Sequence, residues 1–400
     1  MIAYTDIKKV LSYALIIFIL FIFSGGSSLS NDKTVITGGW FFFTIVYFYY
    51  ENYIKPSFIA LTLVFIGVSI LYYLLNDGYN SVTYTGLFIK IYLAYYCRDL
   101  CKDDFYEYFV KIIYVLTCIS LILFTVQLIN FDYLYNLNKI FGQELSGTET
   151  DLTAKSNSII FTMVPIHVVR NCGFMWEPGS FVTVLIITLY INLFKQGESF
   201  FSTKNIVFLI AILTTQSTMG FLALLIPITL ALKDIIMQNR TYQQLAVVIV
   251  PAFVLTFAIV FTRVDFLYAK MANEIKELEE EHKRIALGER DNFVVSVTRT
   301  MSVILDMQTI KKYPLLGLGV DMRTVSFKKL GYSEKLQTAC GTTILILRFG
   351  LIGFILYTYL MYKNAFFDRT IHKIGWVLLI NYALFTQEIS ADSFFHLFIF

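Results

Sequence analysis

Residues 170–194 read RNCGFMWEPGSFVTVLIITLYINLF, which places an arginine and a glutamate directly before an apolar run. Pro178 suits the first turn of a helix, because its missing N–H would be unpaired there anyway. The run therefore predicts an apolar helix with Glu177 at its positive end and Arg170 just outside it. In a chain this apolar, such a charged pair favours chemistry on an anionic substrate. An arginine at this position is equally expected of a simple interfacial anchor.

The composition places the chain in a membrane. Of its 400 residues, 57% are hydrophobic and 15% are charged, whereas about 25% are charged in soluble domains. The first apolar run has no small-residue cleavage site behind it, so it predicts a retained helix and not a secretion signal. In addition to the eleven spans given in the next sentence, an apolar stub at 394–400 is too short to cross the membrane and would begin a twelfth span. Apolar runs predict spans at 10–29, 35–50, 57–75, 80–97, 109–129, 178–194, 205–216, 219–232, 245–262, 341–362 and 374–387.

Lysine and arginine set the predicted orientation, because cytoplasmic loops carry an excess of them. With a cytoplasmic N-terminus, Lys33 is the only basic residue in the short outer loops. Two long segments, 130–177 and 263–340, then lie outside. The predicted inner loops hold Lys8, Lys9, Lys55, Arg98, Lys102, Lys111, Lys195, Lys204, Lys233, Arg240, Lys363, Arg369 and Lys373.

The number of spans within 205–232 decides on which side of the membrane every later loop lies. Thr214-Thr-Gln-Ser-Thr218 interrupts this run, and each half is about 20 Å long as a helix, too short for a full crossing. We interpret the run as two short helices that meet at a wet, protein-walled cavity open to the outside. A single tilted or kinked helix is the alternative, and it would reverse every later loop.

Other classes of site have little support in the sequence. Cys97 and Cys101 lack further ligand partners for zinc. Cys172 and Cys340 both fall in predicted outer segments, but no pattern brings them together. The chain has no Gly-rich phosphate loop and no nucleic-acid motif, and we predict neither a metal nor a cofactor.

Further motifs lie in the second outer segment and just after it. Arg290-Asp-Asn-Phe precedes an amphipathic stretch that contains Arg299. The proline and glycines of Tyr313-Pro-Leu-Leu-Gly-Leu-Gly319 demand a tight turn. Phe349-Gly-Leu-Ile-Gly353 then lies in the predicted re-entry into the membrane.

The chain resembles the O-antigen polymerases of the Wzy type, within the superfamily that also holds the O-antigen ligases. By topology the resemblance covers nearly the whole chain. By motif it rests on Arg170-x-x-Gly-Phe-x-Trp-Glu-Pro-Gly179, Ser217, Arg290 ahead of Pro314-Leu-Leu-Gly-x-Gly319, and Phe349-Gly-Leu-Ile-Gly353. Because Gln337-Thr-Ala-Cys-Gly-Thr-Thr343 lacks the histidine expected of a ligase and Ser217 is followed by Thr218, the sequence favours a polymerase over a ligase.

The resemblance implies a metal-independent glycosyltransferase of the GT-C type in the bacterial inner membrane, with its active site facing the periplasm. It would join oligosaccharide units carried on undecaprenyl pyrophosphate during lipopolysaccharide biosynthesis. A chain-length regulator and a flippase are the expected partners, and nucleic acid is not. Arg170 and Arg290 would grip the pyrophosphate bidentately. Glu177 would act as the base, with His167 as the alternative. Arg299, His167 and Ser217 would contact the substrate.

The predicted fold is an all-α polytopic membrane protein with about 11–12 transmembrane helices, GT-C-like, with two long periplasmic loops. An O-antigen ligase is one alternative, and a flippase or transporter of lipid-linked oligosaccharides is the alternative from another class. Transporters place charges near the membrane midplane, whereas here only Lys90 and Arg348 lie well inside predicted spans. The predicted parts are N-terminal transmembrane helices (1–129), a periplasmic loop (130–177), central transmembrane helices (178–262), a large periplasmic loop (263–340) and C-terminal transmembrane helices (341–400).

Overall fold

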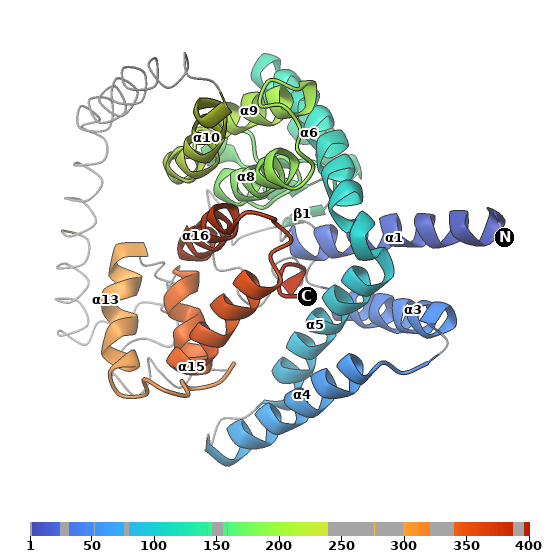
Figure 1. Cartoon of the computed structure of the whole chain (residues 1–400). Coiled ribbons are helices and arrows are strands. Elements are labelled where there is room, and N and C mark those ends of the chain that lie inside the picture. Colours follow the sequence, from blue (N-terminus) through green and yellow to red (C-terminus); the bar gives the residue numbers. More distant parts are fainter. Residues whose placement is uncertain are drawn as a thin grey trace.

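The part of the chain that the structure describes is mostly helical (Figure 1). The computed structural model describes residues 2–24, 32–51, 53–75, 80–141, 143–145, 155–157, 159–238, 276, 299–320, 340–386 and 396–400. The helices are α1 (Ile2–Phe23), α3 (Lys33–Glu51), α4 (Pro56–Leu75), α5 (Ser81–Cys101), α6 (Phe105–Ile129), α7 (Phe131–Phe141), α8 (Pro178–Phe194), α9 (Thr203–Thr215), α10 (Thr218–Gln238), α13 (Arg299–Ile310), α15 (Gly341–Lys363) and α16 (Thr370–Thr386). The strands are β1 (Gln143–Leu145), β2 (Lys155–Asn157) and β3 (Thr162–Met163).

A helix overlaps each predicted span that the structure describes, so the prediction of a mainly α-helical protein is confirmed. The span at 245–262 lies outside the described residues. Among the described residues, Pro56–Leu75, Ser81–Ile129 and Gly341–Lys363 are long and apolar enough to cross a membrane, and α8 and α9 are shorter apolar helices. These helices support a membrane protein, and the number of spans stays a prediction.

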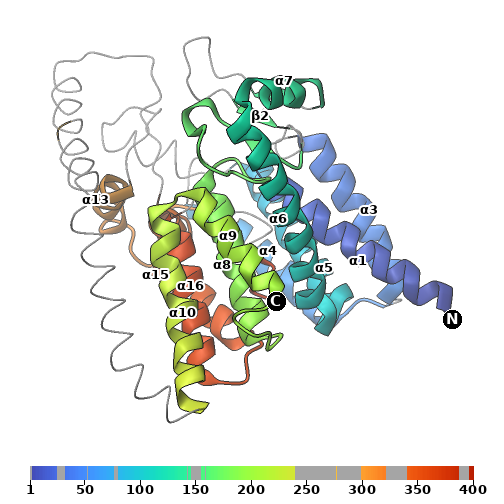
Figure 2. The same ribbon diagram turned by 90° about the horizontal axis from the view of Figure 1, so that it is seen from above.

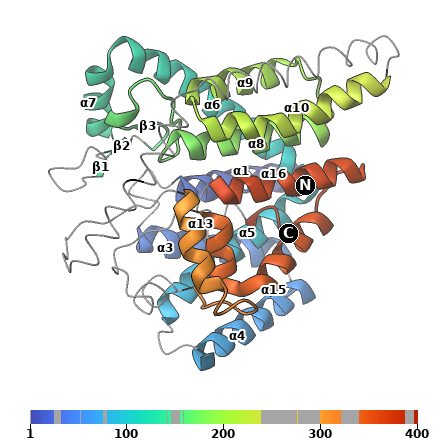
Figure 3. The same cartoon turned by 90° about the vertical axis from the view of Figure 1, so that its left-hand side faces the viewer.

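Helix α8 lies at the centre of the helices that carry the first motif. Its residues from Ser180 to Leu193 are buried on every side. A helix that is apolar all round must be enclosed, and α6, α9, α10 and α16 pack around α8 (Figures 2 and 3). Pro178 occupies the first turn as predicted, and Glu177 immediately precedes it with an extended backbone. This packing fixes the position from which Glu177 projects.

Helices α9 and α10 are separated by a sharp break. Gln216 ends α9 with a left-handed backbone (φ 47°, ψ 40°), and α10 begins at Thr218. A left-handed residue cannot continue a right-handed helix, so the chain must turn here. The prediction of two helices is confirmed, and the alternative of one continuous helix over 205–232 is wrong.

The directions of the three helices place this break beside the start of α8. The side-chain amide of Asn192, near the end of α8, donates to Asn205, near the start of α9, over 2.8 Å. Helices α8 and α9 are therefore antiparallel. Gly220, near the start of α10, lies against Val182, near the start of α8, so those two helices are parallel. Residues 216–217, which we call the hairpin tip, thus lie at the same end of the bundle as Glu177.

The first predicted outer loop contains helix α7 and a small antiparallel sheet in the order β1-β2-β3. In the sheet, Asn157 pairs with Gln143 on one side and with Thr162 on the other. The sequence analysis did not predict these strands, because each has only two or three residues and no alternating pattern can show in so few. Phe161 beside the sheet is fully buried and packs in one cluster with Phe124 of α6, so the sheet covers the end of that helix (Figure 3).

Helix α15 is not the continuous span that the sequence predicted at 341–362. It is interrupted at Gly350, which has a left-handed backbone (φ 68°, ψ −177°). Residues 314–320, which we call the strap, dock against this interruption. The predicted tight turn in the strap is confirmed, because Gly317 (φ 69°) and Gly319 (φ 89°) both adopt conformations that favour glycine. The hydropathy of the span did not show the interruption, because the immediate neighbours of Gly350, Phe349 and Leu351, are apolar.

Hydrogen bonds join the strap to the interrupted helix. The N–H of Leu318 donates to the carbonyl oxygen of Leu347 over 2.6 Å. The N–H of Gly319 donates to the carbonyl oxygen of Arg348 over 2.9 Å, and the hydroxyl of Tyr72 in α4 donates to the same oxygen over 2.9 Å. The carbonyl groups freed by the interruption are therefore paired within the protein. Non-helical backbone at membrane depth requires such pairing.

The described part of the C-terminal stub lies inside the bundle. Leu397 and Phe398 are buried, and the Phe398 ring meets the Trp376 ring of α16 edge-on, with 5.1 Å between the centroids. The side-chain amide of Asn364 also donates to the carbonyl oxygen of Ile399. These contacts place residues 396–400 against α6, α16 and the end of α15.

Basic side chains from the predicted inner loops pair with acidic side chains of neighbouring helices and loops. Lys55 forms ion pairs of 2.5 Å with Glu51 and with Asp99. Arg369 pairs with Asp234 over 2.8 Å, which joins the end of α10 to the start of α16. The fold thus brings together loops that the charge pattern assigned to one side. The side of the membrane that they face stays a prediction.

The charge pattern and the hairpin together predict the topology of reporter fusions. A reporter inserted at 233–243 should report a cytoplasmic location, because that segment begins in the last turns of α10, which carry Lys233. A reporter inserted within 263–340 should report a periplasmic location. Measuring alkaline phosphatase and green fluorescence from matched fusions checks both sites. The opposite result at both sites would reverse the proposed orientation.

Candidate functional site

The first motif forms a loop, residues 167–177, between the small sheet and α8, and we call it the mouth loop. Its turn is made at Gly173, which has a left-handed backbone (φ 54°) and whose missing Cβ would lie 2.6 Å from the ring of Phe181. The N–H of Gly173 donates to the side-chain oxygen of Asn171 over 2.9 Å. Its carbonyl oxygen accepts from the N–H of Thr162 in β3 over 2.7 Å. The sheet and α8 thus fix the course of the loop.

Arg170 is held by one edge of its guanidinium group. Its Nε donates to the carbonyl oxygen of Thr215, next to the hairpin tip, over 3.0 Å. Burial lowers the pKa of Arg170, whereas the Cys172 thiol and the Glu177 carboxylate raise it. The group keeps its charge regardless, because an arginine is not deprotonated in a protein. Within the described part of the chain, the two Nη groups have no hydrogen-bond partner, so they are available to an anion.

Glu177 lies at the amino end of α8, as the sequence predicted. Its carbonyl oxygen accepts from the N–H of Phe181 over 3.2 Å, which starts the helix. Its carboxylate accepts from the hydroxyl of Ser180 at 3.5 Å and does not cap the helix. The charge of Glu177 raises the pKa of Arg170, so the two side chains lie within electrostatic range of each other, and their catalytic roles stay predictions. The helix dipole stabilises a carboxylate at this position.

The predicted substrate contacts His167 and Ser217 also lie at this end of the bundle. Ser217 is 5% exposed, and its hydroxyl accepts from the N–H of Gly220 at 3.4 Å, so its described contact caps α10. His167 ends a short 3-10 helix, Pro165–His167, and its carbonyl oxygen accepts from the N–H of Arg170 over 3.0 Å. A contact of either side chain with substrate stays a prediction.

The two other predicted arginines are not part of the mouth loop as described. Arg290 lies outside the described residues. Arg299 begins α13, which packs against α15. Their roles toward the substrate stay predictions.

Two buried amides support the mouth loop, and the sequence analysis missed both. Asn171 is fully buried, and its side chain donates to the hydroxyls of Ser120 in α6 and Thr214 in α9 over 3.4 and 3.1 Å. Gln127 of α6 is 2% exposed and donates to the carbonyl oxygen of Val168 over 2.6 Å. A glutamine inside the apolar run 109–129 was the one available signal, because an isolated amide in a membrane span needs a partner.

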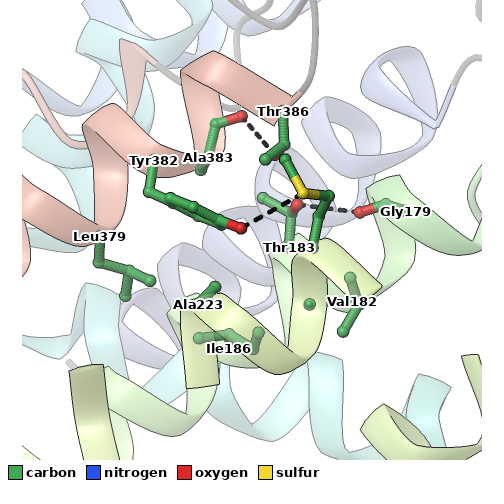
Figure 4. Close-up of a pocket in the computed structure, with 11 residues that line it drawn as sticks. Gly179, Val182, Thr183, Ile186, Ala223, Leu379, Tyr382, Ala383 and Thr386 are labelled. Carbon is green, nitrogen blue, oxygen red and sulfur yellow. Dashed lines mark hydrogen bonds between the residues drawn. The ribbon is translucent and has the colours of Figure 1, made fainter. Parts of the chain in front are cut away.

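A cavity adjoins the start of α8, between α8, α10 and α16 (Figure 4). It has a volume of only about 10 Å³, room for roughly one water molecule, and begins at Gly179, two residues beyond Glu177. Its lining is mostly apolar. Two hydroxyl groups in the lining form hydrogen bonds within the protein: Thr183 donates to the carbonyl oxygen of Gly179 over 2.9 Å, and Tyr382 donates to the Sδ of Met219 over 3.5 Å. The wet cavity that the sequence predicts at the hairpin stays a prediction, because this cavity is too small to hold a substrate.

Cys172 and Cys340 are both buried and are not joined in a disulfide in this structure. Among the described residues, no group of three or more histidine, cysteine, aspartate and glutamate side chains is placed to hold a metal ion.

Comparison with known proteins adds no assignment: no family model matches the chain, and no curated protein does. The function must therefore be argued from the geometry of the mouth loop and from the sequence motifs that form it.

Proposed function

We propose that the chain is an O-antigen polymerase, a metal-independent membrane glycosyltransferase. It would join oligosaccharide repeat units carried on undecaprenyl pyrophosphate, at the periplasmic face of the inner membrane. The observation that carries the proposal is the arrangement of Arg170, with a fixed Nε and two available Nη groups, beside Glu177 at the amino end of α8.

The reaction requires a cation at the leaving group and a base at the attacking group. A hydroxyl of the acceptor sugar attacks the anomeric carbon of the donor, and the bond from that carbon to the pyrophosphate oxygen breaks. The pyrophosphate leaves with the bonding electrons, and the Nη groups of Arg170 stabilise its growing charge. The hydroxyl proton passes to the carboxylate of Glu177. Arg290 is the second cation that the sequence resemblance assigns to the same pyrophosphate.

The interrupted helix α15 favours a second candidate, a flippase of lipid-linked oligosaccharides. Transporters use discontinuous helices to bind ions and substrates at the midplane, and Arg348, next to the interruption, is 8% exposed. The strap nevertheless occupies this interruption and takes the carbonyl oxygens of Leu347 and Arg348. Those oxygens are therefore already satisfied by protein, so we prefer the polymerase.

Deleting the gene separates these functions. Loss of a polymerase should leave lipid A–core capped with a single repeat unit, because transfer to the core does not require a polymer. Loss of a ligase or of a flippase should leave bare core. Lipopolysaccharide from the deletion strain and from a complemented strain, separated by electrophoresis, shows which occurs. Bare core in the deletion strain, with the neighbouring genes intact, would reject the polymerase.

A further inference from the structure

Two glutamine side chains hold the backbone of the mouth loop. The Nε2 of Gln127, from α6, donates to the carbonyl oxygen of Val168 over 2.6 Å, with the carbonyl oxygens of His167 and Arg170 at 3.5 and 3.4 Å. The Nε2 of Gln216, at the hairpin tip, donates to the carbonyl oxygen of Val169 over 3.1 Å. Four successive carbonyl groups, ending at Arg170, are thus held by two amides from separate elements. We call these two amides the amide bracket.

The orientation of the Gln127 amide follows from its surroundings. Only an N–H₂ group can face the carbonyl oxygens of His167, Val168 and Arg170, so the opposite assignment of nitrogen and oxygen is excluded. Turning the amide over would set its oxygen against three other oxygens.

Gln216 holds its position at a cost in backbone energy. Its left-handed conformation (φ 47°) is uncommon for a residue other than glycine, and asparagine or aspartate are the usual exceptions. Glycine would adopt this conformation without strain, but glycine would carry no amide. A strained residue that makes a specific contact is typical of functional sites.

Gln216 also directly follows Thr215, whose carbonyl oxygen receives the Nε of Arg170. The backbone N–H of Asn171 donates to the carbonyl oxygen of Thr214 over 3.0 Å. Residues 214–216 therefore contact the loop before, at and after Arg170. A shift of this segment would move the guanidinium group directly.

We propose that Gln127 and Gln216 are positioning residues that hold the Nη groups of Arg170 in place to receive a lipid-linked pyrophosphate. The inference rests on the proposed function, because it assumes that Arg170 binds that pyrophosphate. Donor groups that are already held in place bind an anion without the cost of ordering them. Removing an amide of the bracket should therefore weaken pyrophosphate binding even though Arg170 is still present. The bracket acts only through Arg170, and it has no effect once that side chain is removed.

Gln216→Gly is the decisive variant, because it removes the amide and relieves the backbone strain together. The full-length protein in lipid vesicles would be titrated with undecaprenyl pyrophosphate lacking sugars. We expect binding to weaken about 10-fold, the equivalent of one lost hydrogen bond at the upper end of its usual range. The midpoint of thermal unfolding should stay unchanged or rise, because the strain is gone. Gln127→Leu should weaken binding similarly, provided that it folds.

The matched control is Gln196→Leu. Gln196 makes the same type of contact, from its amide to the carbonyl oxygen of Tyr106 over 3.1 Å, but at the opposite end of the bundle. This variant should bind as tightly as the wild-type protein. In an Arg170→Ala background, Gln216→Gly should cause no further loss, which a purely structural contact would not produce.

The possible results distinguish failure of the amide-bracket inference from failure of the proposed function. The role of the amide bracket would be overturned if Gln216→Gly bound the pyrophosphate lipid as tightly as the wild-type protein. It would also be overturned if Gln216→Gly weakened binding as much in the Arg170→Ala background as in the wild-type background. Failure of the wild-type protein to bind the pyrophosphate lipid, or binding that ignores Arg170→Ala, would overturn the proposed function itself.

Discussion

Replacing Arg170 with lysine is expected to lower the rate of polymerisation 100-fold or more at a normal protein level. Lysine keeps the positive charge but loses the planar fork that binds two pyrophosphate oxygens at once. It also has no group equivalent to Nε, so the contact with the carbonyl oxygen of Thr215 is lost. Removing one charge-assisted contact that strengthens in the transition state costs about 3 kcal/mol. Alanine should be no better than lysine.

The interfacial-anchor interpretation makes the opposite prediction. An anchor needs only a long basic side chain, so lysine would replace Arg170 almost freely. The length of the polymer in a complemented deletion strain, together with an immunoblot for the protein, decides between the two. Lys276→Ala is a suitable control, because Lys276 is exposed in the second outer segment and lies outside the motifs. The sequence resemblance predicts the same loss for Arg290→Lys. Full-length polymer in both arginine variants would end the hypothesis of a pyrophosphate clamp.

The positions of the helices were predictable because hydropathy is a local property of the sequence. Each membrane crossing needs its own apolar run, and the polar residues 214–218 divided α9 from α10 as expected. The extent of each helix was less predictable. Helix α10 continues to Gln238, beyond the apolar run that ended at residue 232, because charged residues extend a helix past the hydrocarbon without cost.

Part of the site was predictable for the same reason. Arg170 and Glu177 are close in the sequence, and Pro178 fixed the start of α8, so their proximity followed from one motif. The amide bracket depends on contacts between distant segments, Gln127 with Val168 and Gln216 with Val169. A single sequence contains no signal that pairs such residues. For the same reason the strap was predicted as a turn, while its docking on α15 was not.

Replacing Gly350 with alanine is expected to destabilise the folded protein by about 3 kcal/mol or more. A Cβ at Gly350 would lie 1.9 Å from the carbonyl oxygen of Leu315 and 2.5 Å from the backbone nitrogen of Leu316. These are backbone atoms of the strap, so no side-chain rotation can make room. The left-handed φ of 68° adds strain that alanine would have to bear. Backbone strain and overpacking each cost about 1–3 kcal/mol.

The measurement is the midpoint of thermal unfolding of the purified protein in detergent, with Gly86→Ala as the control. Gly86 also lies in an apolar helix, α5, but a Cβ there would meet nothing within 4 Å. Gly86→Ala should therefore be neutral or slightly stabilising, because alanine favours a helix by about 1 kcal/mol. Gly317→Ala should resemble Gly350→Ala, since its Cβ would lie 2.5 Å from the carbonyl oxygen of Leu347. The double variant should cost much less than the sum of the two, because either change alone already displaces the strap. Equal stability of Gly350→Ala and Gly86→Ala would show that the strap does not dock there.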